Sequence, residues 1–203
     1  MSAFFRAENI SFAYPGGKEI IQDFTLLMEH GECLGIQGPS GCGKSTLAQI
    51  LAGHLRPQTG QVYLEGVDIT NRPQRAVFMV HQDGDLFPWL SVEKQIAIAD
   101  PNPSRIQQLI ELTKLKSFEK YYPHQLSGGM KKRLAIARAL AVSPKVLIFD
   151  ESFNSLDFEM RQEIFKDLKQ IWRELKTSIL VISHDPRDIH SIAEREIRWE
   201  ERR

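Results

Sequence analysis

The stretch GPSGCGKST, residues 38–46, limits what this chain can fold into more than any other part of the sequence. It satisfies the pattern G-x-x-x-x-G-K-[ST] with Gly38, Gly43, Lys44 and Ser45, and it follows the apolar run ECLGIQ, which is typical of a strand. Glycines at these positions allow the backbone to curl so that its N–H groups face a bound anion. The sequence therefore predicts a strand, a phosphate-binding loop and a helix in succession.

The helix after this loop is expected over KSTLAQILAGHL, residues 44–55. One face of that segment is apolar, with Leu47, Ile50, Leu51 and Leu55. Its N-terminus would add the positive end of a helix dipole to the anion site. In such loops the lysine, here Lys44, reaches the β- and γ-phosphates of a nucleotide, and the next hydroxyl, here Ser45, binds Mg²⁺. The alternative, a glycine-rich turn that matches by chance, does not explain the strand and helix on either side.

Apolar runs typical of strands alternate with helical patterns in the rest of the chain. The runs AVFMVHQ (76–82), KVLIFD (145–150) and SILVIS (178–183) predict buried strands, the last two as neighbours, and VYLEGVDI (62–69) predicts another. A charged amphipathic helix is predicted over Phe158–Leu175. Strands separated by helices favour a parallel sheet in an α/β fold.

The middle of the chain has no strong strand signal between residues 88 and 138. Pro101 and Pro103 would break any helix there, and the segment SRIQQLIELTKL that follows places Ile106, Leu109 and Ile110 on one helical face. We therefore expect residues 88–138 to form a helical insertion in the α/β core.

Polar side chains end three of the predicted strands, at the edge where parallel sheets bind ligands. Asp150 and Glu151 end the run VLIFDE, Gln82 ends AVFMVHQ, and His184 follows SILVIS. Asp150 would hold the Mg²⁺ shell, and Glu151 would accept a proton from an attacking water. Each residue alone is also explained as a strand end entering solvent or as a hydrogen-bonded structural group. Combined with the phosphate-binding loop, they indicate nucleotide hydrolysis.

Seven motifs in order give the chain a resemblance to the ATP-binding cassette ATPases, the nucleotide-binding subunits of ABC transporters. The resemblance covers nearly the whole chain. The motifs are the A-loop aromatic Tyr14 in SFAYPGG, the Walker A loop GPSGCGKST, the Q-loop residue Gln82 in HQDGDLFPWLSV, the signature LSGGM from Leu126 to Met130, the Walker B strand VLIFDE, the D-loop NSLD from Asn154 to Asp157, and the H-loop SHD from Ser183 to Asp185.

This resemblance implies an α/β fold with a P-loop ATPase core and a mostly parallel sheet. An antiparallel β subdomain at the N-terminus and an inserted α-helical subdomain, about residues 88–138, would complete a single domain over residues 1–203. It also implies that the chain binds ATP and Mg²⁺ and hydrolyses ATP to ADP and phosphate.

The resemblance also assigns the site residues. The catalytic residues are Glu151, His184 and Gln82, and the metal ligands are Ser45, Gln82 and Asp150. The nucleotide-binding residues are Tyr14, which would stack on adenine, then Gly38, Ser40, Gly41, Cys42, Gly43, Lys44, Ser45, Thr46, Ser127, Gly128, Gly129 and Asp157. His184 would contact the γ-phosphate.

The signature is a second candidate phosphate site in the same chain. Ser127 is a good helix N-cap, and a helix that starts after Gly128 and Gly129 offers free N–H groups to an anion. In the resembled family this site acts on the ATP held by the Walker A loop of a partner cassette packed head to tail. ATP then joins two cassettes and hydrolysis releases them, with Asp157 connecting the two sites.

Two residues depart from the family pattern. Met130 stands where the signature usually has Gln, and Ser152 stands where Pro usually follows the catalytic glutamate; MKKR also replaces a more amide-rich run. None of these changes removes a phosphate, metal or base ligand, so we expect activity. Nineteen residues follow His184, and we expect no accessory regulatory domain.

The partners follow from the resemblance, and composition sets limits on them. We expect transmembrane permease subunits, a second ABC ATPase subunit that is identical or a paralogue, and an extracytoplasmic substrate-binding protein. The 26 basic and 26 acidic residues balance, so a nucleic-acid partner is not indicated. The opening residues lack a secretory pattern, and no run of about 18 apolar residues occurs. We therefore expect a peripheral protein on the cytoplasmic face of the membrane.

The main alternative is a soluble cassette ATPase, above all one in iron–sulfur assembly, since such cassettes are also short and single. DNA-repair members would need a long coiled coil, and translation-factor members two cassettes; neither pattern occurs here. FPWLSV after Gln82 favours a transporter, because importer cassettes grip a permease helix there. A nucleotide kinase or GTPase that shares only the phosphate loop does not explain LSGGM and SHD.

Overall fold

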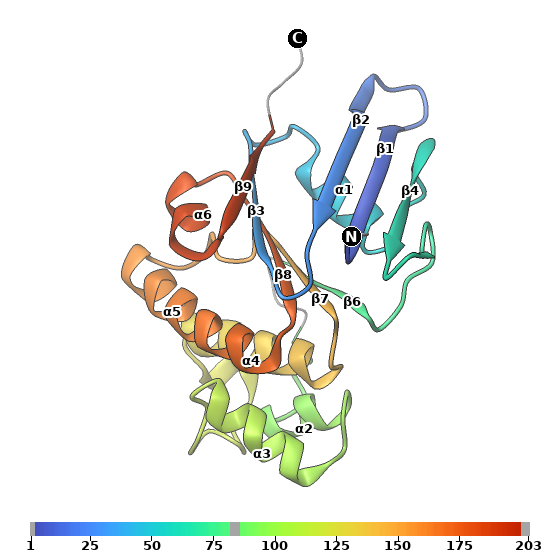
Figure 1. The fold of residues 1–203 in the computed structure, drawn as a ribbon. Helices are drawn as coiled ribbons and strands as arrows, with labels where there is room; N and C mark the ends of the chain where they lie inside the picture. Colours follow the sequence, from blue (N-terminus) through green and yellow to red (C-terminus); the bar gives the residue numbers. More distant parts are fainter. Residues whose placement is uncertain (1–2, 82–85, 200–203) are drawn as a thin grey trace.

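A computed structural model describes residues 3–81 and 86–199 of the chain. It contains two sheets with helices packed around them (Figure 1). The antiparallel sheet has the strand order β2-β1-β4-β5, and the parallel sheet has the order β6-β7-β8-β3-β9. In the antiparallel sheet the strands are β1 (Phe5–Ala13), β2 (Glu19–Met28), β4 (Thr59–Leu64) and β5 (Val67–Asp68). In the parallel sheet they are β3 (Cys33–Gln37), β6 (Val77–Val80), β7 (Val146–Asp150), β8 (Ser178–Ser183) and β9 (Arg195–Arg198).

Helices cover the parallel sheet on both faces, and this explains why its central strands are apolar throughout. In β7, Val146 and Ile148 point into a core shared with the first helix and the antiparallel sheet, whereas Leu147 and Phe149 point into a core shared with helices on the other face. The helices are α1 (Lys44–Leu51), α2 (Val92–Ala97), α3 (Pro103–Leu112), α4 (Gly128–Ala141), α5 (Phe158–Leu175) and α6 (Pro186–Ile192), with a short 3₁₀ helix η1 at Pro123–Gln125. The expected α/β fold class is confirmed.

Three predicted elements match the structure closely. The strands predicted at residues 145–150 and 178–183 are β7 and β8, and they pair in parallel. The helix predicted at Phe158–Leu175 is α5. It begins after Asp157, whose carboxylate accepts from the Met160 N–H at 2.8 Å, and it ends where Lys176 turns left-handed at φ 52°.

Two sequence-based boundaries were wrong. The strand predicted at residues 62–69 is a hairpin, because Glu65 and Gly66 both adopt positive φ and reverse the chain between β4 and β5. The helix predicted at residues 44–55 ends at Leu51, and Gly53, at φ 75°, takes the chain out of helical geometry.

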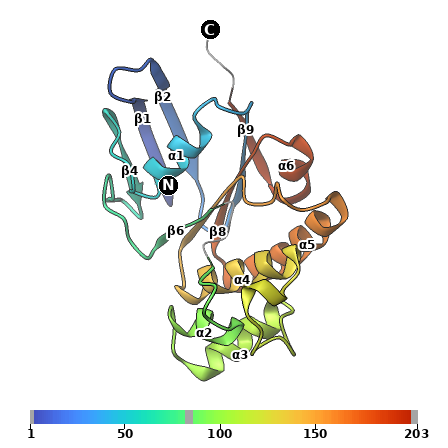
Figure 2. The ribbon, with the colours of Figure 1, turned by 180° about the vertical axis from the view of Figure 1, so that it is seen from behind.

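The segment between residues 88 and 138 holds α2, α3, η1 and most of α4, and its described residues include no strand. In Figure 1, α2 and α3 lie below the parallel sheet, with α4 between them and the sheet; Figure 2 shows the same order from behind. Pro103 does not break a helix but begins α3, where Asn102 caps the N-terminus by accepting from Ser104 N at 3.0 Å. Among the helices in the described residues, none is both long and apolar enough to cross a membrane.

Candidate nucleotide-binding site

The phosphate-binding loop lies where the sequence predicts it, between the carboxyl end of β3 and the first turn of α1. Gly41 and Gly43 adopt φ of 82° and 102°, a region that strongly favours glycine. A Cβ on Gly43 would also lie 2.4 Å from Cγ2 of Ile20, so a larger residue there would collide with β2. The loop conformation thus depends on glycine for both backbone and packing reasons.

Lys44 is buried in this loop, with 4% of its surface exposed. Its Nζ donates to the carbonyl oxygens of Gly38 at 2.9 Å and Pro39 at 2.7 Å, and it lies 3.3 Å from Oε1 of Glu151. The loop lysine and the strand-end glutamate are therefore in direct contact, although 107 positions separate them in the sequence.

Glu151 contacts three other side chains of the site, Lys44, Asn154 and His184. Its Oε2 lies 2.8 Å from Nδ1 of His184 and accepts from Nδ2 of Asn154 at 2.6 Å, and its backbone is left-handed at φ 47°. Burial raises the pKa of its carboxyl, but hydrogen bonds from Asn154 and His184 and the charge of Lys44 outweigh burial, so the pKa lies below its usual value. The carboxylate is therefore ionised at neutral pH and can act as a base.

Asp150 ends β7 beside the loop. Burial raises the pKa of its carboxyl, an effect that a hydrogen bond from Ser45 opposes. Within the described part of the chain, its buried Oδ1 has no hydrogen-bond partner. A buried carboxylate oxygen without a partner, next to a serine hydroxyl, fits the oxygen ligands that Mg²⁺ prefers.

A cavity of about 450 Å³ opens between these groups. Its lining consists of Tyr14, Ile20, Ser40, Gly41, Gly43, Lys44, Ser45, Thr46, Glu151, Asn154 and His184. Tyr14 is 46% exposed, and its hydroxyl lies 3.2 Å from Oγ1 of Thr46 at the start of α1. The exposed ring lies at the mouth of the phosphate-binding loop, where a base attached to bound phosphates would be found.

The remaining predicted residues divide into three groups. Gly38, Cys42 and Asp150 adjoin lining residues without lining the cavity themselves. Ser127, Gly128, Gly129 and Asp157 do not line it. Gln82 lies outside the described residues.

The signature lies on the other side of the parallel sheet from the phosphate-binding loop. It begins α4, which packs on the face opposite α1, and Figures 1 and 2 show the two helices apart in both views. Ser127 caps α4 by accepting from Met130 N at 3.3 Å, as the sequence predicts for an N-cap. The two candidate phosphate-binding features of this chain are therefore not brought together within the described residues.

The two departures from the family pattern have structural roles. Met130 packs against the hydrophobic core between the parallel sheet and α4. Ser152 is fully buried, and its hydroxyl donates to the Val80 carbonyl at 2.6 Å, a bond that proline cannot make. Ser152 therefore ties the turn after β7 to the end of β6.

The sequence did not predict two of the lining residues, Ile20 and Asn154, and of these Asn154 is the polar one. It was predicted only as the first letter of NSLD, yet its amide lines the cavity and donates to Glu151. The only sequence signal is an amide three positions after a strand-end carboxylate, and that spacing is not specific.

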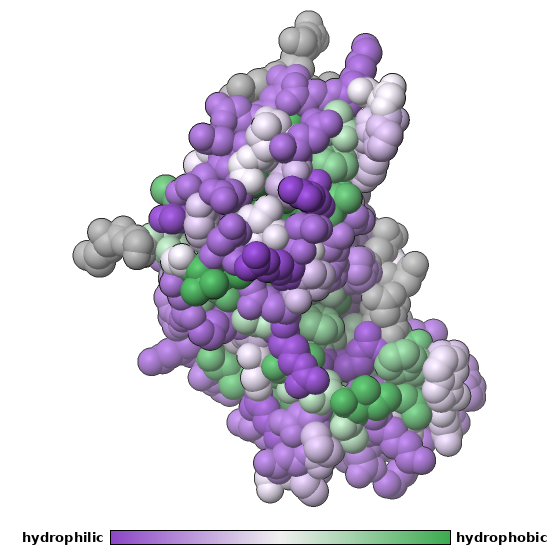
Figure 3. Space-filling model, turned by 90° about the vertical axis from the view of Figure 1, so that its right-hand side faces the viewer, coloured by the Kyte–Doolittle hydropathy of each residue, from purple (hydrophilic) through white to green (hydrophobic). Residues whose placement is uncertain are grey.

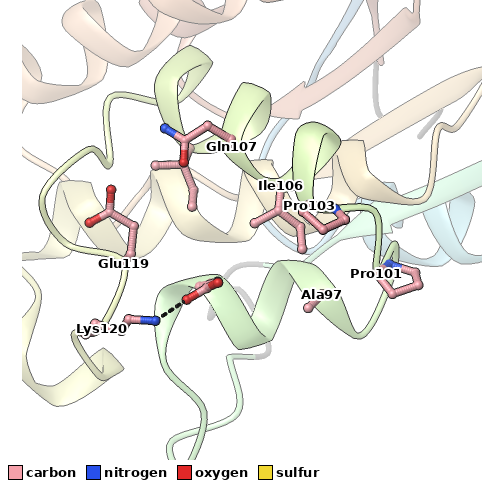
Figure 4. Close-up of a pocket in the computed structure, with 9 residues that line it drawn as sticks. Ala97, Pro101, Pro103, Ile106, Gln107, Glu119 and Lys120 are labelled. Carbon is pink, nitrogen blue, oxygen red and sulfur yellow. Dashed lines mark hydrogen bonds and ion pairs between the residues drawn. The ribbon is translucent and has the colours of Figure 1, made fainter.

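A larger cavity, about 600 Å³, lies in the helical part of the chain (Figure 4). Ala97 of α2 and Ile106 of α3 face each other across it, and Lys120 closes one end through an ion pair of 2.6 Å with Glu93. In the part of the chain that the structure describes, none of the predicted nucleotide ligands lines it. Its size therefore does not make it the nucleotide site.

Comparison with known proteins identifies the relatives of this arrangement. The family model described as "ABC transporter" matches residues 21–154. The spermidine/putrescine import ATP-binding protein PotA of Vibrio vulnificus is 38% identical over 201 residues, which cover 94% of this chain and 53% of that protein. The aliphatic sulfonates import ATP-binding protein SsuB of Bacillus subtilis is 41% identical over 181 residues, covering 86% of this chain and 71% of that protein. The chain thus spans about half the length of the PotA relatives.

Solved structures agree with these relatives. The structure of cbiO1 from Clostridium perfringens, part of the ABC transporter complex cbiONQ, superposes with a TM-score of 0.84 at 29% identity, over 91% of this chain and 80% of that one. A dimeric, post-hydrolysis state of the ATP-binding cassette MJ0796 bound to ADP and phosphate gives a TM-score of 0.82 at 27% identity, over 97% and 94% of the two chains.

Proposed function

This chain belongs to the ABC transporter family, and we propose that it is the subunit that binds and hydrolyses ATP to drive import through a membrane permease. The observation that carries this proposal is the contact of 3.3 Å between the phosphate-loop lysine Lys44 and Glu151, which joins a phosphate cradle to a base. The curated relatives reported above are both import subunits, which favours a transporter over an iron–sulfur assembly cassette.

ATP would enter the cavity with its phosphates over the loop and its adenine on the exposed ring of Tyr14. Lys44 would then bind the phosphates and leave Oε1 of Glu151 free. His184 uses Nδ1 to hold Oε2 of Glu151, and its Nε2 has no hydrogen bond within the described residues, so Nε2 is placed to donate to the terminal phosphate. Glu151 would use the freed Oε1 to accept the proton of the attacking water.

We propose Ser45 and Asp150 as ligands for Mg²⁺, with Gln82 as the third ligand that the family resemblance assigns. When bound, Mg²⁺ neutralises charge on the phosphate oxygens. The unpartnered Oδ1 of Asp150 supports this assignment.

We propose that the signature completes the site of a second cassette. Its position across the sheet from its own Lys44, and the dimeric state of the similar cassette MJ0796, support this arrangement. Ser127, Gly128 and Gly129 would bind the partner's ATP at the N-terminus of α4, and Asp157 would lie at the same interface.

The helical segment of residues 88–138 is our candidate surface for the permease. The cavity of about 600 Å³ is in this segment. Trp89, which belongs to the same segment, is 69% exposed. Figure 3 shows hydrophobic side chains gathered on the lower part of one face, where this segment lies. A permease bound there would hold the chain at the cytoplasmic face of the membrane, and a substrate-binding protein would work on the other side.

The test of the shared site uses two inactive variants. Lys44→Ala cannot cradle phosphate, and Ser127→Arg fills the signature with a charged side chain. Mixed in equal amounts, they form heterodimers in which the Walker A loop of the Ser127→Arg chain faces the signature of the Lys44→Ala chain. With random pairing we expect the mixture to recover about a quarter of wild-type ATPase activity.

Dimer formation gives an independent readout for the case in which the two sites are coupled and a heterodimer with one intact site does not hydrolyse ATP. In a Glu151→Gln background, size-exclusion chromatography with ATP should show a dimer, and adding Ser127→Arg should abolish it while each monomer still binds nucleotide. An intact ATP-induced dimer of the Ser127→Arg chain, or full-rate hydrolysis by its monomer, would exclude the shared site.

A further inference from the structure

We propose that Asn154 is a positioning residue for ATP hydrolysis, which holds the Glu151 carboxylate so that one oxygen is fixed and the other faces the reacting water. The inference rests on the proposed ATPase function and deepens it. The observation that supports it is the hydrogen bond of 2.6 Å from Nδ2 of Asn154 to Oε2 of Glu151; both residues line the cavity.

The two oxygens of Glu151 have different surroundings. Oε2 has two contacts, Nδ2 of Asn154 at 2.6 Å and Nδ1 of His184 at 2.8 Å. Oε1 has Lys44 at 3.3 Å, a longer contact to a group that phosphates would attract away. Oε2 is therefore the anchored oxygen, and Oε1 is the one that becomes available.

His184 alone is a weak anchor for this carboxylate. Its side chain is 45% exposed, so water competes with its hydrogen bond, and its Nε2 is the atom that we assign to phosphate. A histidine that moves toward phosphate would release or rotate the carboxylate. Asn154 supplies a second donor from a different segment, which keeps Oε2 in place when His184 responds to the nucleotide.

The turn that carries Asn154 is itself fixed on both sides. Phe153 is 2% exposed and packs against Phe149 and Phe165, with ring centroids 5.3 and 4.8 Å away. Leu156 is 7% exposed, and its N–H donates to the Phe153 carbonyl at 3.1 Å. Asn154 itself donates its backbone N–H to the Glu151 carbonyl at 3.4 Å. The side-chain amide is therefore held in position before any nucleotide contact, as a positioning residue requires.

The position of Asn154 also links the base to the proposed dimer interface. The turn runs three residues further to Asp157, which caps α5. A partner chain that contacts Asp157 would act on the same short turn that orients Glu151. Dimer formation would then affect hydrolysis through the short turn that connects Asp157 to Asn154 and Glu151.

The test compares Asn154→Ala and Asn154→Asp with wild type in steady-state ATPase assays and in nucleotide-binding assays. Aspartate keeps the shape of asparagine, but its ionised side chain only accepts hydrogen bonds and has no donor. We expect both variants to lower kcat by at least about tenfold, because a misplaced base loses part of its rate enhancement. KM for ATP and the nucleotide affinity should stay within about twofold of the wild-type values. Asn154→Ser, which keeps a donor, should recover part of kcat.

Two controls separate positioning from a general structural effect. Gln170→Ala removes an amide-to-carboxylate bond of 3.0 Å to Glu174 on the exposed face of α5, and it should leave kcat unchanged. In the Glu151→Gln background, Asn154→Ala should not reduce the residual single-turnover rate further, because its effect passes through the carboxylate.

The outcomes are distinguishable. If wild-type protein does not hydrolyse ATP, the proposed function fails and this inference falls with it. If wild type hydrolyses ATP and Asn154→Asp keeps the wild-type kcat, the positioning role alone is overturned. A loss confined to KM, or an additive loss in the Glu151→Gln background, would likewise overturn it.

Discussion

Replacing Gly129 of the signature with alanine should weaken ATP-driven dimer formation, and shortening Met160 should restore it. A Cβ on Gly129 would lie 2.5 Å from Sδ and 3.0 Å from Cγ of Met160, in the first turn of α5. Contacts between such atoms prefer about 3.5–4.0 Å, so either the Met160 side chain or one helix end must shift by roughly 1 Å. We expect the crowded helix end to shift, and the N–H groups of the signature to move with it.

The size of the effect follows from two opposing terms. Overpacking of this kind costs about 1–3 kcal/mol, and alanine returns up to about 1 kcal/mol in a helix because glycine is a poor helix former. A net cost of about 1.4 kcal/mol corresponds to about a tenfold loss in affinity. Since a head-to-tail dimer uses the signature twice, we expect its dissociation constant to rise at least about tenfold.

The assay uses the Glu151→Gln background, in which ATP is bound and not turned over. Dimer fraction is measured against protein concentration by size-exclusion chromatography with light scattering, for Gly129→Ala, Met160→Ala and the double variant. Met160→Ala alone should dimerise like the parent, with a lower melting temperature from lost packing. The double variant should return to within about threefold of the parent, since the Met160 side chain that the methyl would strike is gone.

Two results would refute this reasoning. If Gly129→Ala dimerises as well as the parent, Met160 has moved aside at no cost. If the double variant stays monomeric with ATP, the added methyl group collides with something other than Met160, and the contact between the two helix ends does not set the signature geometry.

Three further predictions follow from the site. Glu151→Gln should bind ATP with normal affinity and lose turnover by at least about a hundredfold in a phosphate-release assay, because the amide cannot accept a proton; a wild-type rate would remove Glu151 from that role. Maleimide should modify Cys42 and block nucleotide binding, and ATP with Mg²⁺ should protect Cys42 from modification. Cys33 should not react, because burial raises the pKa of its thiol to about 12. Unchanged ATP binding after full Cys42 modification by mass spectrometry would contradict this. Hydrogen bonds from Arg187 lower the pKa of Asp185 to about 2 from its ordinary 3.8, so its contribution to stability is present above pH 3.8 and lost as the pH falls toward 2. Asp185→Asn, which keeps the helix cap, should cost about 1 kcal/mol at pH 7 and nothing below pH 2, and equal urea stability at pH 7 would contradict it.

The sequence predicts elements best where burial and capping agree. β7 and β8 are buried on both faces, so their apolar runs end where the sheet ends. Asp157 caps α5, so its N-terminus is visible from the sequence. The hairpin at residues 59–68 was missed because Glu65 adopts φ 50° and only the glycine after it gives a turn signal. β9 was missed because its sequence REIR is mostly charged and its place in the sheet depends on pairing with β3.

The candidate site was predictable to the extent that it lies at strand ends. Asp150 ends β7, and Glu151 and His184 directly follow β7 and β8, so parallel pairing alone brings their side chains to one edge of the sheet. The contact from Asn154 was not predictable, because it depends on the left-handed backbone of Glu151 and on the turn that Phe153 and Leu156 fix. Side-chain contacts made within an irregular turn have no periodic signal.

The contacts of Lys44 predict a link between nucleotide binding and release of the proposed base. An ammonium group has three N–H donors, and among the described residues Lys44 has three partners: the Gly38 carbonyl, the Pro39 carbonyl and Oε1 of Glu151. A phosphate that binds Lys44 must therefore displace one of them. The two carbonyls belong to the loop that would bind the phosphate. Both lie closer to Nζ of Lys44 than Oε1 of Glu151 does. We therefore expect the phosphate to displace the carboxylate, so that the binding of ATP and the freeing of Oε1 would be one event.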